Sequence, residues 1–395
     1  MPGPGMFLFG EEERAELLDV MESGYLFRYG MENDKDYKRK VATFENEFAK
    51  KIGVNHCFAT SSGSGALMAS LSALGIGEGD EVIVAGYTFI ASISAIIMLN
   101  AKPILAEIDN SLTIDPDDIE KRITPRAKAI MPVHMLGNPC NMDKIMAIAK
   151  KHNLYVIEDC CQATGASYKG RRLGSFGDIS AFSLNIFKTI TCGDGGMVTT
   201  NDSDLYECAF GFHDQGHKPN RMGVEVGNRS IIGMNMRMNE LSGAVALAQV
   251  RKLDKMLDML REKKSKLKAK LAGAKGFKFR QINDPGECAT LLTLIFDTKE
   301  GADAFCGKID AKTLSHSGWH VYNNMEQLLT ADNNFKKDYG IRPHMLPQTD
   351  DILSRAVNIS VGVVDKGLGA GFGINILSSD DEIDACAEAI KGFLM

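Results

Sequence analysis

Lys188 is the residue whose surroundings point most directly to chemistry. It follows the letters NIF and precedes TITCG, and no other charged residue occurs within five positions on either side. Most lysines lie exposed to water, so a lysine in such an apolar setting is a candidate for a nucleophilic amine. An amine of that kind forms a Schiff base with an aldehyde. The segment therefore predicts covalent chemistry at Lys188, beside a turn that contains Gly193, Gly195 and Gly196.

A carboxylate and an amide follow another apolar run. Asp159 closes the run LYVIED, and Gln162 comes three residues later. Such a run is typical of a strand buried in a parallel sheet, and these sheets bind ligands outside the carboxyl ends of their strands. An aspartate at this place can equally be an ordinary helix N-cap. The residues alone leave both interpretations open.

Two further segments could hold parts of a ligand. Residues 62–66 (SGSGA) open a helical pattern, and free N–H groups at a helix start can bind a phosphate, although such caps are common. Phe89 follows the run EVIVAG and is either a core residue or a platform for a ring. Pyridoxal 5′-phosphate (PLP) needs a phosphate anchor, here around Ser64, a carboxylate at its ring nitrogen and a lysine at its aldehyde. The four groups together predict this cofactor.

Alternating strands and helices would bring these residues together. Short apolar runs occur at 81–86, 102–109, 127–135, 154–160, 179–184 and 196–201, with helical patterns such as 142–152 between them. This alternation predicts parallel βαβ units and a doubly wound α/β domain. Two more helices are expected before it, at 10–23 and 40–52.

The chain is long for a single core, so we expect two domains. A helical pattern without proline runs from about residue 235 to 271, apolar in its first half and highly charged in its second. Such a helix leaves one core and crosses to another. Strand patterns at 290–297 and 356–364 and helical patterns at 300–309 and 380–394 follow it. We predict a large domain at 1–255 and a smaller C-terminal α/β domain at 256–395.

Composition excludes several classes of partner. The 395 residues include 45 Lys and Arg against 51 Asp and Glu, a net charge of −6, which argues against nucleic acid or an anionic membrane as the main partner. No apolar run approaches the ~20 residues of a membrane helix, and the N-terminus lacks the basic segment of a signal peptide. Nine cysteines without a CxxC pair favour reduced thiols. We expect a cytoplasmic protein.

Six motifs, in order along the chain, resemble those of the DegT/DnrJ/EryC1/StrS family of PLP-dependent sugar aminotransferases. They are SSGSGAL at 61–67, GDEVIVAGYTFIAS at 79–92, VIEDCCQATGASYKGRRLGSFGD at 156–178, FSLNIFK at 182–188, GDGGMVTTND at 193–202 and GMNMRMNELSGAVALAQVRKLD at 233–254. The resemblance spans roughly residues 7–260. It implies the type I fold of PLP-dependent aminotransferases, in which helices sandwich a mostly parallel seven-stranded sheet.

The resemblance also implies how the cofactor is bound. Lys188 would bind the aldehyde of PLP, Asp159 would pair with its ring nitrogen, and Gln162 would contact its ring hydroxyl. Phe89 would stack on the ring. The phosphate would be held by Ser64, Gly65 and Ser183. The family usually has Thr where this chain has Ser64.

Two more residues acquire roles through the same resemblance. Asn235 would reach the phosphate bound by a neighbouring subunit, so the implied assembly is a homodimer with shared active sites. Arg237 is a candidate for binding the carboxylate of the amino donor.

The implied activity is transfer of an amino group from an amino acid, usually L-glutamate in this family, to a keto or aldehyde sugar. The segments LFRYG (26–30), KTITCGDGG (188–196), HDQGH (213–217) and HVYNN (320–324) resemble the branch that aminates C8 of 3-deoxy-octulosonate. A nucleotide-linked keto sugar is the alternative substrate. A substrate with its own carboxylate would need a basic partner, for which Arg28 and His217 are candidates, although each can be an ordinary surface or loop residue.

Three other functions fit the sequence less well. In the PLP-dependent sugar dehydratases of the same fold a histidine replaces the lysine, so Lys188 argues against them. A nicotinamide oxidoreductase needs a glycine fingerprint in its first βαβ unit, whereas the similar cluster here lies late, at 367–373. A regulator without catalysis would not need both Lys188 and Asp159.

A metal enzyme is the fourth alternative. His213, Asp214 and His217 form one possible ligand group, and His316 with His320 forms another. Two histidines four residues apart can share a helix face. Neither pair has an obvious helical context or a third ligand, so no metal is expected.

Overall fold

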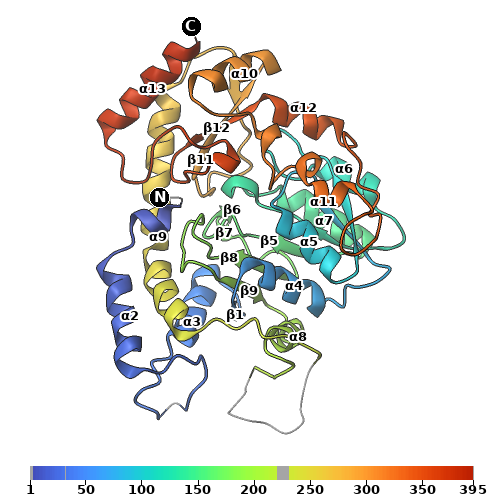
Figure 1. The fold of residues 1–395 in the computed structure, drawn as a ribbon, viewed down its shortest axis with the longest axis vertical. Helices are drawn as coiled ribbons and strands as arrows, with labels where there is room; N and C mark the ends of the chain where they lie inside the picture. The colour runs from blue at the N-terminus through green and yellow to red at the C-terminus, as the bar shows by residue number, and fades with distance from the viewer. Residues whose placement is uncertain (1–2, 32, 220–230, 395) are drawn as a thin grey trace.

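A seven-stranded sheet forms the centre of the molecule, and a three-stranded sheet lies above it in Figure 1. The computed structural model describes residues 3–31, 33–219 and 231–394. The large sheet has the order β1-β9-β8-β5-β4-β2-β3. Its strands are β1 (His56–Thr60), β2 (Glu81–Ala85), β3 (Lys102–Ala106), β4 (Ala127–Met131), β5 (Tyr155–Asp159), β8 (Ile179–Ser183) and β9 (Gly196–Thr200).

All strands of the large sheet except β9 point the same way. β2 pairs in parallel with β3 and β4, and β5 pairs in parallel with β4 and β8. β9 is antiparallel to both β8 and β1, so β1 runs in the direction of β8. The carboxyl ends of six strands therefore meet at one edge, where sheets of this type bind ligands. The predicted α/β fold with a mostly parallel sheet is confirmed.

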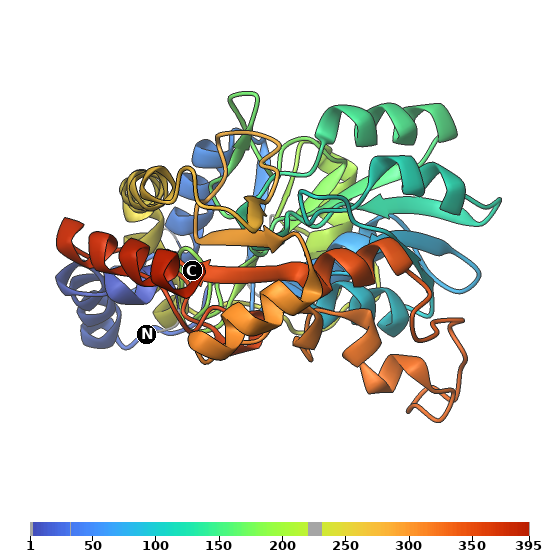
Figure 2. The same cartoon turned by 90° about the horizontal axis from the view of Figure 1, so that it is seen from above.

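Helices flank the large sheet, as Figures 1 and 2 show. The helices that follow strands of this sheet in the sequence are α4 (Gly63–Ala73), α5 (Ile90–Met98), α6 (Pro116–Arg122), the short η1 (Met135–Gly137), α7 (Met142–His152) and α8 (Ser203–His213). Three helices precede it: α1 (Pro4–Phe7), α2 (Glu11–Ser23) and α3 (Lys40–Ile52). β2, β8 and β9 are buried along their whole length, as strands covered on both faces must be.

A single helix of 31 residues, α9 (Glu240–Lys270), connects the two sheets. Its first half packs against α2 and α3, and its carboxyl-terminal part reaches α13 (Figure 1). Glu240 accepts hydrogen bonds from the N–H groups of Lys40 and Val41 at 2.7 and 3.1 Å, so it provides partners for the first buried N–H groups of α3. In the charged half, Lys266 pairs with Asp380 at 2.7 Å. The predicted crossing helix is confirmed, while the domain boundary at 255/256 lies inside it and stays a prediction.

The C-terminal part contains an antiparallel sheet with β11 in the middle, in the order β10-β11-β12. Its strands are β10 (Phe277–Phe279), β11 (Leu291–Phe296) and β12 (Ala356–Ser360). The helices around it are α10 (Lys299–Lys308), η2 (Leu314–His316), η3 (Tyr322–Asn324), α11 (Glu326–Leu329), α12 (Pro347–Arg355), η4 (Lys366–Leu368) and α13 (Asp380–Leu394). β11 is buried along its whole length, so this sheet adds to the core.

The strands and helices expected from the apolar patterns are present. Several elements were not predicted, among them β1, α8, β10, α12 and a two-stranded ribbon of β6 (Ser167–Tyr168) with β7 (Arg171–Arg172). β1 escapes prediction because its letters, HCFAT, begin and end with polar residues and span only five positions. Its position matters, because it delivers the start of α4 to the ligand-binding edge of the sheet.

Gly243 of α9 lies against Val41 of α3, so a substitution at Gly243 tests the contact between the two helices. An added Cβ would lie 2.5 Å from Val41 Cγ2 and 2.8 Å from the Val41 backbone nitrogen. Ala in place of a helical Gly normally stabilises by ~1 kcal/mol, but overpacking costs about 1–3 kcal/mol. We expect Gly243→Ala to lower the free energy of unfolding, measured by urea titration.

The matched control is Gly392→Ala in α13, because nothing lies within 4 Å of the added Cβ. This variant should raise the free energy of unfolding by up to about 1 kcal/mol. Equal gains in both variants would contradict the close approach of α3 and α9.

Candidate active site

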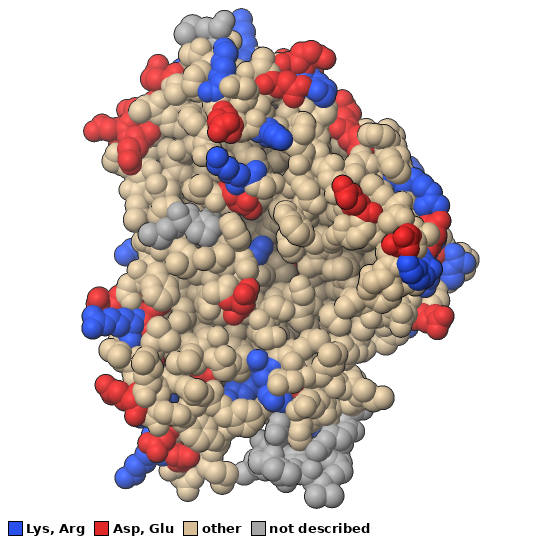
Figure 3. Space-filling view, viewed as in Figure 1, with Lys and Arg blue, Asp and Glu red and all other residues tan. Residues whose placement is uncertain are grey.

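A cavity of about 540 Å³ opens where the carboxyl ends of the strands meet the C-terminal part of the chain. The face in Figure 3 is hollowed near its centre. Residues from both parts of the chain line the cavity. The lining includes Ser62, Gly63, Ser64, Phe89, Ser92, Leu136, Asp159, Cys161, Gln162, Ser183, Lys188, Trp319, His320 and Asp365. Most of the predicted cofactor residues are thus brought to one place.

Lys188 lies on the loop between β8 and β9, half-buried at the cavity wall. Its N–H donates to the carbonyl of Asn185 at 2.9 Å, which closes a turn directly after β8. Its Nζ lies 6.0 Å from the centre of the Phe89 ring. Phe89 is 39% exposed and lines the same cavity. The structure therefore places Phe89 as a cavity platform and not as a core residue.

Asp159 is the last residue of β5 and is only 3% exposed. Its Oδ2 accepts a hydrogen bond from the Ser92 hydroxyl at 2.7 Å, and its Oδ1 accepts one from the Cys161 N–H at 3.0 Å. Ser92 also hydrogen-bonds to the Thr88 hydroxyl at 2.7 Å. Both donors to the carboxylate are neutral. A buried carboxylate held in this way attracts a cationic group of a ligand.

The start of α4 forms another wall. Ser62 is its N-cap and accepts a hydrogen bond from the Gly65 N–H at 3.0 Å. The first N–H groups of a helix have no partner within the helix, so those of Gly63 and Ser64 are available to an anion. A Cβ on Gly63 would lie 2.8 Å from the Cβ of Ser183 at the end of β8. Gly63 therefore lets the helix start and Ser183 form one narrow polar cradle.

Gln162 lies at the cavity wall just after β5. Its Oε1 accepts a hydrogen bond from the N–H of Leu136, in η1, at 3.0 Å. This contact fixes the amide of Gln162, because its oxygen is held and its NH₂ group remains as a donor.

The C-terminal part contributes cavity residues that we did not predict as site residues. His320 lies 5.3 Å from Phe89 between ring centres, and its Nδ1 is 2.9 Å from the Ser317 hydroxyl. Burial and the nearby charge of Lys188 lower the pKa of His320 to about 3, so this ring is neutral. Trp319 and Asp365 also line the cavity. No local pattern singled out Trp319 or Asp365, because loops supply them and the tertiary fold brings them in. His320 was noted only within the segment 320–324 and, with His316, as a possible metal ligand. Ser92 was also missed, although its position three residues after Phe89 on a helix was a usable signal.

Five predicted residues lie outside the cavity lining of the single chain. The first is Gly65, whose N–H donates to the Ser62 hydroxyl. Arg28 is 5% exposed and pairs with Glu45 at 2.7 Å. Asn235 lies on the exposed surface, and Arg237 pairs with Asp214 at 2.5 Å. His217 is 9% exposed and its N–H donates to the carbonyl of Asp214. The position of Arg28 lends no support to a substrate role within its own chain.

The suspected metal ligands have other partners. His213 Nδ1 lies 2.5 Å from the Phe210 carbonyl oxygen and its Nε2 lies 3.4 Å from Arg28. Burial and the Arg28 charge lower the pKa of His213 to about 3. Asp214 binds Arg237 and accepts from the Tyr29 hydroxyl at 2.8 Å. These contacts describe a structural polar cluster.

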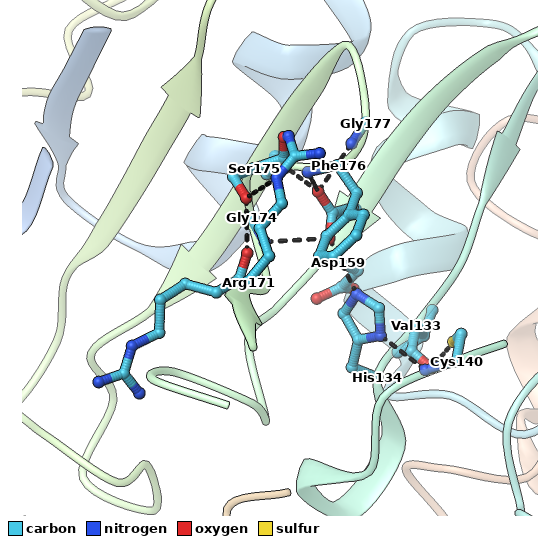
Figure 4. A network of polar contacts seen from close by, with 12 residues as sticks. Val133, His134, Cys140, Asp159, Arg171, Gly174, Ser175, Phe176 and Gly177 are labelled. Carbon is cyan, nitrogen blue, oxygen red and sulfur yellow. Dashed lines mark hydrogen bonds and ion pairs between the residues drawn. The ribbon is translucent and has the colours of Figure 1, made fainter. Parts of the chain in front are cut away.

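A second buried polar network lies behind Asp159 (Figure 4). Its centre is Glu158, which accepts hydrogen bonds from the N–H groups of residues 174, 176 and 177 at 3.0, 2.7 and 2.8 Å. His134 donates from Nε2 to Glu158 at 3.3 Å and accepts at Nδ1 from the Cys140 N–H at 3.0 Å. Within the described residues, His134, Glu158 and Cys160 lie close enough to share an ion. Both nitrogens of His134 are already hydrogen-bonded, so the network holds the loops around Asp159.

The chain is similar to known proteins over most of its length. The profile of the DegT/DnrJ/EryC1/StrS aminotransferase family matches residues 9–364. The chain belongs to this family. A GDP-perosamine synthase of Escherichia coli O157:H7 is 45% identical over 223 residues, 56% of this chain and 60% of that protein. A GDP-perosamine synthase of Vibrio cholerae is 34% identical over 289 residues, 72% of this chain and 75% of that protein.

Solved structures agree with the family over nearly the full length. An aminotransferase from Psychrobacter cryohalolentis has a TM-score of 0.81 and 29% identity, covering 99% of this chain and 98% of that one. A 3-amino-5-hydroxybenzoic acid synthase has a TM-score of 0.80 and 27% identity, covering 98% and 96%. The fold is thus that of the PLP-dependent aminotransferases, and enzymes of this family use PLP in general. No helix in the described ranges is long and apolar enough to cross a bilayer.

The site fits that cofactor on its own geometry. The narrow cradle at Gly63 and Ser183 would be filled by a Cβ and suits a phosphate. The buried Asp159 carboxylate, held by neutral donors, suits a protonated ring nitrogen. Lys188 and Phe89 face the same space.

His320 makes stability depend on pH. Its pKa is about 3 in the folded protein against about 6.5 in an unfolded chain, so the unfolded state binds more protons between these values. Stability therefore falls as the pH falls from 6.5 toward 3. Between pH 7 and pH 5, the free energy of unfolding of the His320→Asn variant should fall by about 1–2 kcal/mol less than that of the native protein. Urea unfolding at both pH values measures this difference.

His316→Asn is the matched control, because its ring is exposed on the same segment. It should leave the pH dependence unchanged. An identical pH dependence in the native protein and in the His320 variant would contradict the burial of a neutral His320.

Proposed function

We propose that the protein is a PLP-dependent aminotransferase that moves an amino group from L-glutamate to the carbonyl of a sugar. One observation supports this most strongly: Lys188, Asp159 and the start of α4 line one cavity, although they are far apart in the sequence. These are the three groups that bind an aldehyde, a ring nitrogen and a phosphate. The family supports the same conclusion.

Each residue has a defined task toward the cofactor. The Gly63 and Ser64 N–H groups and the Ser183 hydroxyl would hold the phosphate, and Gly63 takes the place of the predicted Gly65 because the Gly65 N–H donates to Ser62. Phe89 would stack on the ring, Gln162 would contact its hydroxyl and Asp159 would pair with the ring nitrogen. An ion pair at ~4 Å is worth on the order of 4 kcal/mol at an effective dielectric of 20. Bound PLP supplies an aldehyde for the amines and a protonated ring that accepts electrons.

Lys188 carries the proton transfer. With PLP bound, its Nζ would hold the aldehyde. As a free amine it would serve as the general base and acid that moves the proton of the donor's α-carbon. Ser92 and the Cys161 N–H hold Asp159 in one orientation throughout. The same residues act in reverse order on the sugar carbonyl.

The sugar is either C8-oxidised 3-deoxy-octulosonate or a nucleotide-linked keto sugar. The resemblance of four segments to the octulosonate branch supports the first substrate. Two of these segments, 188–196 and 320–324, contribute Lys188 and His320 to the cavity. The other two, 26–30 and 213–217, contact each other through the Tyr29 hydroxyl and Asp214. The names of the relatives, which are GDP-perosamine synthases, support the second.

The proposal includes a homodimer with shared active sites. Large apolar side chains are exposed around the segment that carries Asn235: Leu26 is 50% exposed, Ile232 96% and Met234 58%. Surfaces of this kind favour association. A second copy would bring Asn235, with Arg237 for the donor carboxylate, to the cavity of its neighbour.

We also infer a cytoplasmic location and small-molecule substrates, without nucleic acid or membrane as partners. The nine cysteines, all within the described ranges, are free, which agrees with a reducing compartment.

Lys188 should carry the cofactor covalently. The purified protein is expected to be yellow, and borohydride should fix the pyridoxyl group on the peptide that contains Lys188, as read by mass spectrometry. Lys188→Ala should lower transaminase turnover by at least about 10³-fold because it removes both nucleophile and base. The control is Lys144→Ala, an exposed lysine that pairs with Asp117. A pyridoxyl adduct on any other peptide would overturn the proposal.

The acceptor is identified by half-reactions. Aminated enzyme is mixed with C8-oxidised 3-deoxy-octulosonate and with a panel of nucleotide-linked keto sugars, and absorbance follows the return of the cofactor to its aldehyde form. We expect one class to react at least about 10²-fold faster, because a polar site rejects a substrate that leaves its groups unpaired. If no sugar reacts while an α-ketoacid does, the sugar assignment fails and the aminotransferase assignment stands.

A further inference from the structure

Leu136 lies in an unusual backbone conformation at the cavity wall. Its φ of 55° and ψ of 30° are left-handed, a conformation that is unfavourable for a residue other than Gly. It is 1% exposed and lines the cavity. Such a conformation persists only where the surrounding structure determines it. The contacts that hold this turn are therefore informative.

Two side chains bind the peptide groups of this turn from opposite sides. Gln162 Oε1 accepts from the Leu136 N–H at 3.0 Å. The guanidinium of Arg280 donates to the Leu136 carbonyl at 3.0 Å and to the Met135 carbonyl at 3.3 Å. Arg280 comes from the segment after β10, in the C-terminal part of the chain. Gln162 thus binds the peptide group before Leu136, and Arg280 binds the peptide group after it. Leu136 connects the two contacts.

Arg280 is costly to keep where it is. It is 3% exposed, and its Nε, although buried, makes no hydrogen bond to any residue that the structure describes. Its charge faces Glu287 at 3.5 Å, and Glu287 in turn pairs with Lys264 of α9 at 2.5 Å. Buried ion pairs of this kind are weak stabilisers compared with apolar residues of the same size. Stability alone does not explain the arrangement.

We propose that Arg280 is a positioning residue that holds the left-handed Leu136 turn and thereby fixes the Gln162 amide at the cofactor cavity. Glu287 faces the charge of Arg280 and pairs at the same time with Lys264. A second contact supports the same connection, since the Cys288 N–H donates to the Gly137 carbonyl at 3.0 Å. The inference rests on the proposed function, because it assigns Gln162 to PLP binding.

The test is a double-mutant cycle on the affinity for PLP. Arg280→Met, Gln162→Leu and the double variant are freed of cofactor and titrated with PLP by absorbance. Arg280→Met leaves Lys264 and Glu287 as a neutral pair, so no lone charge is buried. Each single variant should weaken PLP binding by about 10-fold. The double variant should be no more than about 3-fold weaker than either single, because the two residues act through one turn.

Arg355→Met is the matched control. Arg355 also donates to a backbone carbonyl, that of Phe296 at 2.8 Å, but it lies outside the cavity lining. Its loss should lower stability and leave PLP affinity within about 2-fold. Should Arg280→Met fail to fold, Arg280→Lys keeps the charge but not the pair of hydrogen bonds to the turn. We expect Arg280→Lys to weaken PLP binding by about 3-fold in the native background and not to weaken it further in the Gln162→Leu background.

Three results would overturn the inference. One is a full additional loss from Arg280→Met in the Gln162→Leu background, and another is an equal loss of PLP affinity in Arg355→Met. The third is a native protein that binds no PLP, which overturns the proposed function as well. The first two leave the proposed function intact, so the two failures are distinguishable.

Discussion

The site depends on one buried carboxylate. Asp159 ends the central strand β5, is almost fully buried and is held by two neutral donors, the Ser92 hydroxyl and the Cys161 N–H. A carboxylate in such a place is costly unless a positive group meets it. The rest of the cavity provides the remaining anchors for a ligand that carries this group. We propose that the positive group at Asp159 is the protonated ring nitrogen of PLP.

Close backbone approaches make this arrangement possible. Gly63 lets the start of α4 reach the end of β8, where any Cβ would collide with Ser183. The antiparallel β9 lies between β1 and β8 and brings both carboxyl ends to the same edge. Glu158 of β5 accepts hydrogen bonds from the loop 174–177 and holds it in place. Buried strands and hydrogen-bonded loops thus position the site residues.

The C-terminal part is more than a cover. His320 lies beside Phe89, and Arg280 binds the turn that holds Gln162. The role of Arg280 came as a finding, because no local pattern marks it as functional, and His320 was noted only in the segment 320–324 and as a possible metal ligand. Loop residues reach a site through the packing of whole units, and the sequence near them carries little of that information.

The sequence by itself determined the alternation of strands and helices, the crossing helix α9 and the identity of the chemical groups, Lys188, Asp159 and Ser64. It could do so because burial on both faces imposes apolar runs, and because helix starts and isolated lysines have recognisable surroundings. The tertiary structure decided which residues share the cavity. It added Ser92, Trp319 and His320, and it placed Arg28 in a buried pair with Glu45. The physical reason is that contacts between distant segments depend on the packing of whole elements, which no local pattern encodes.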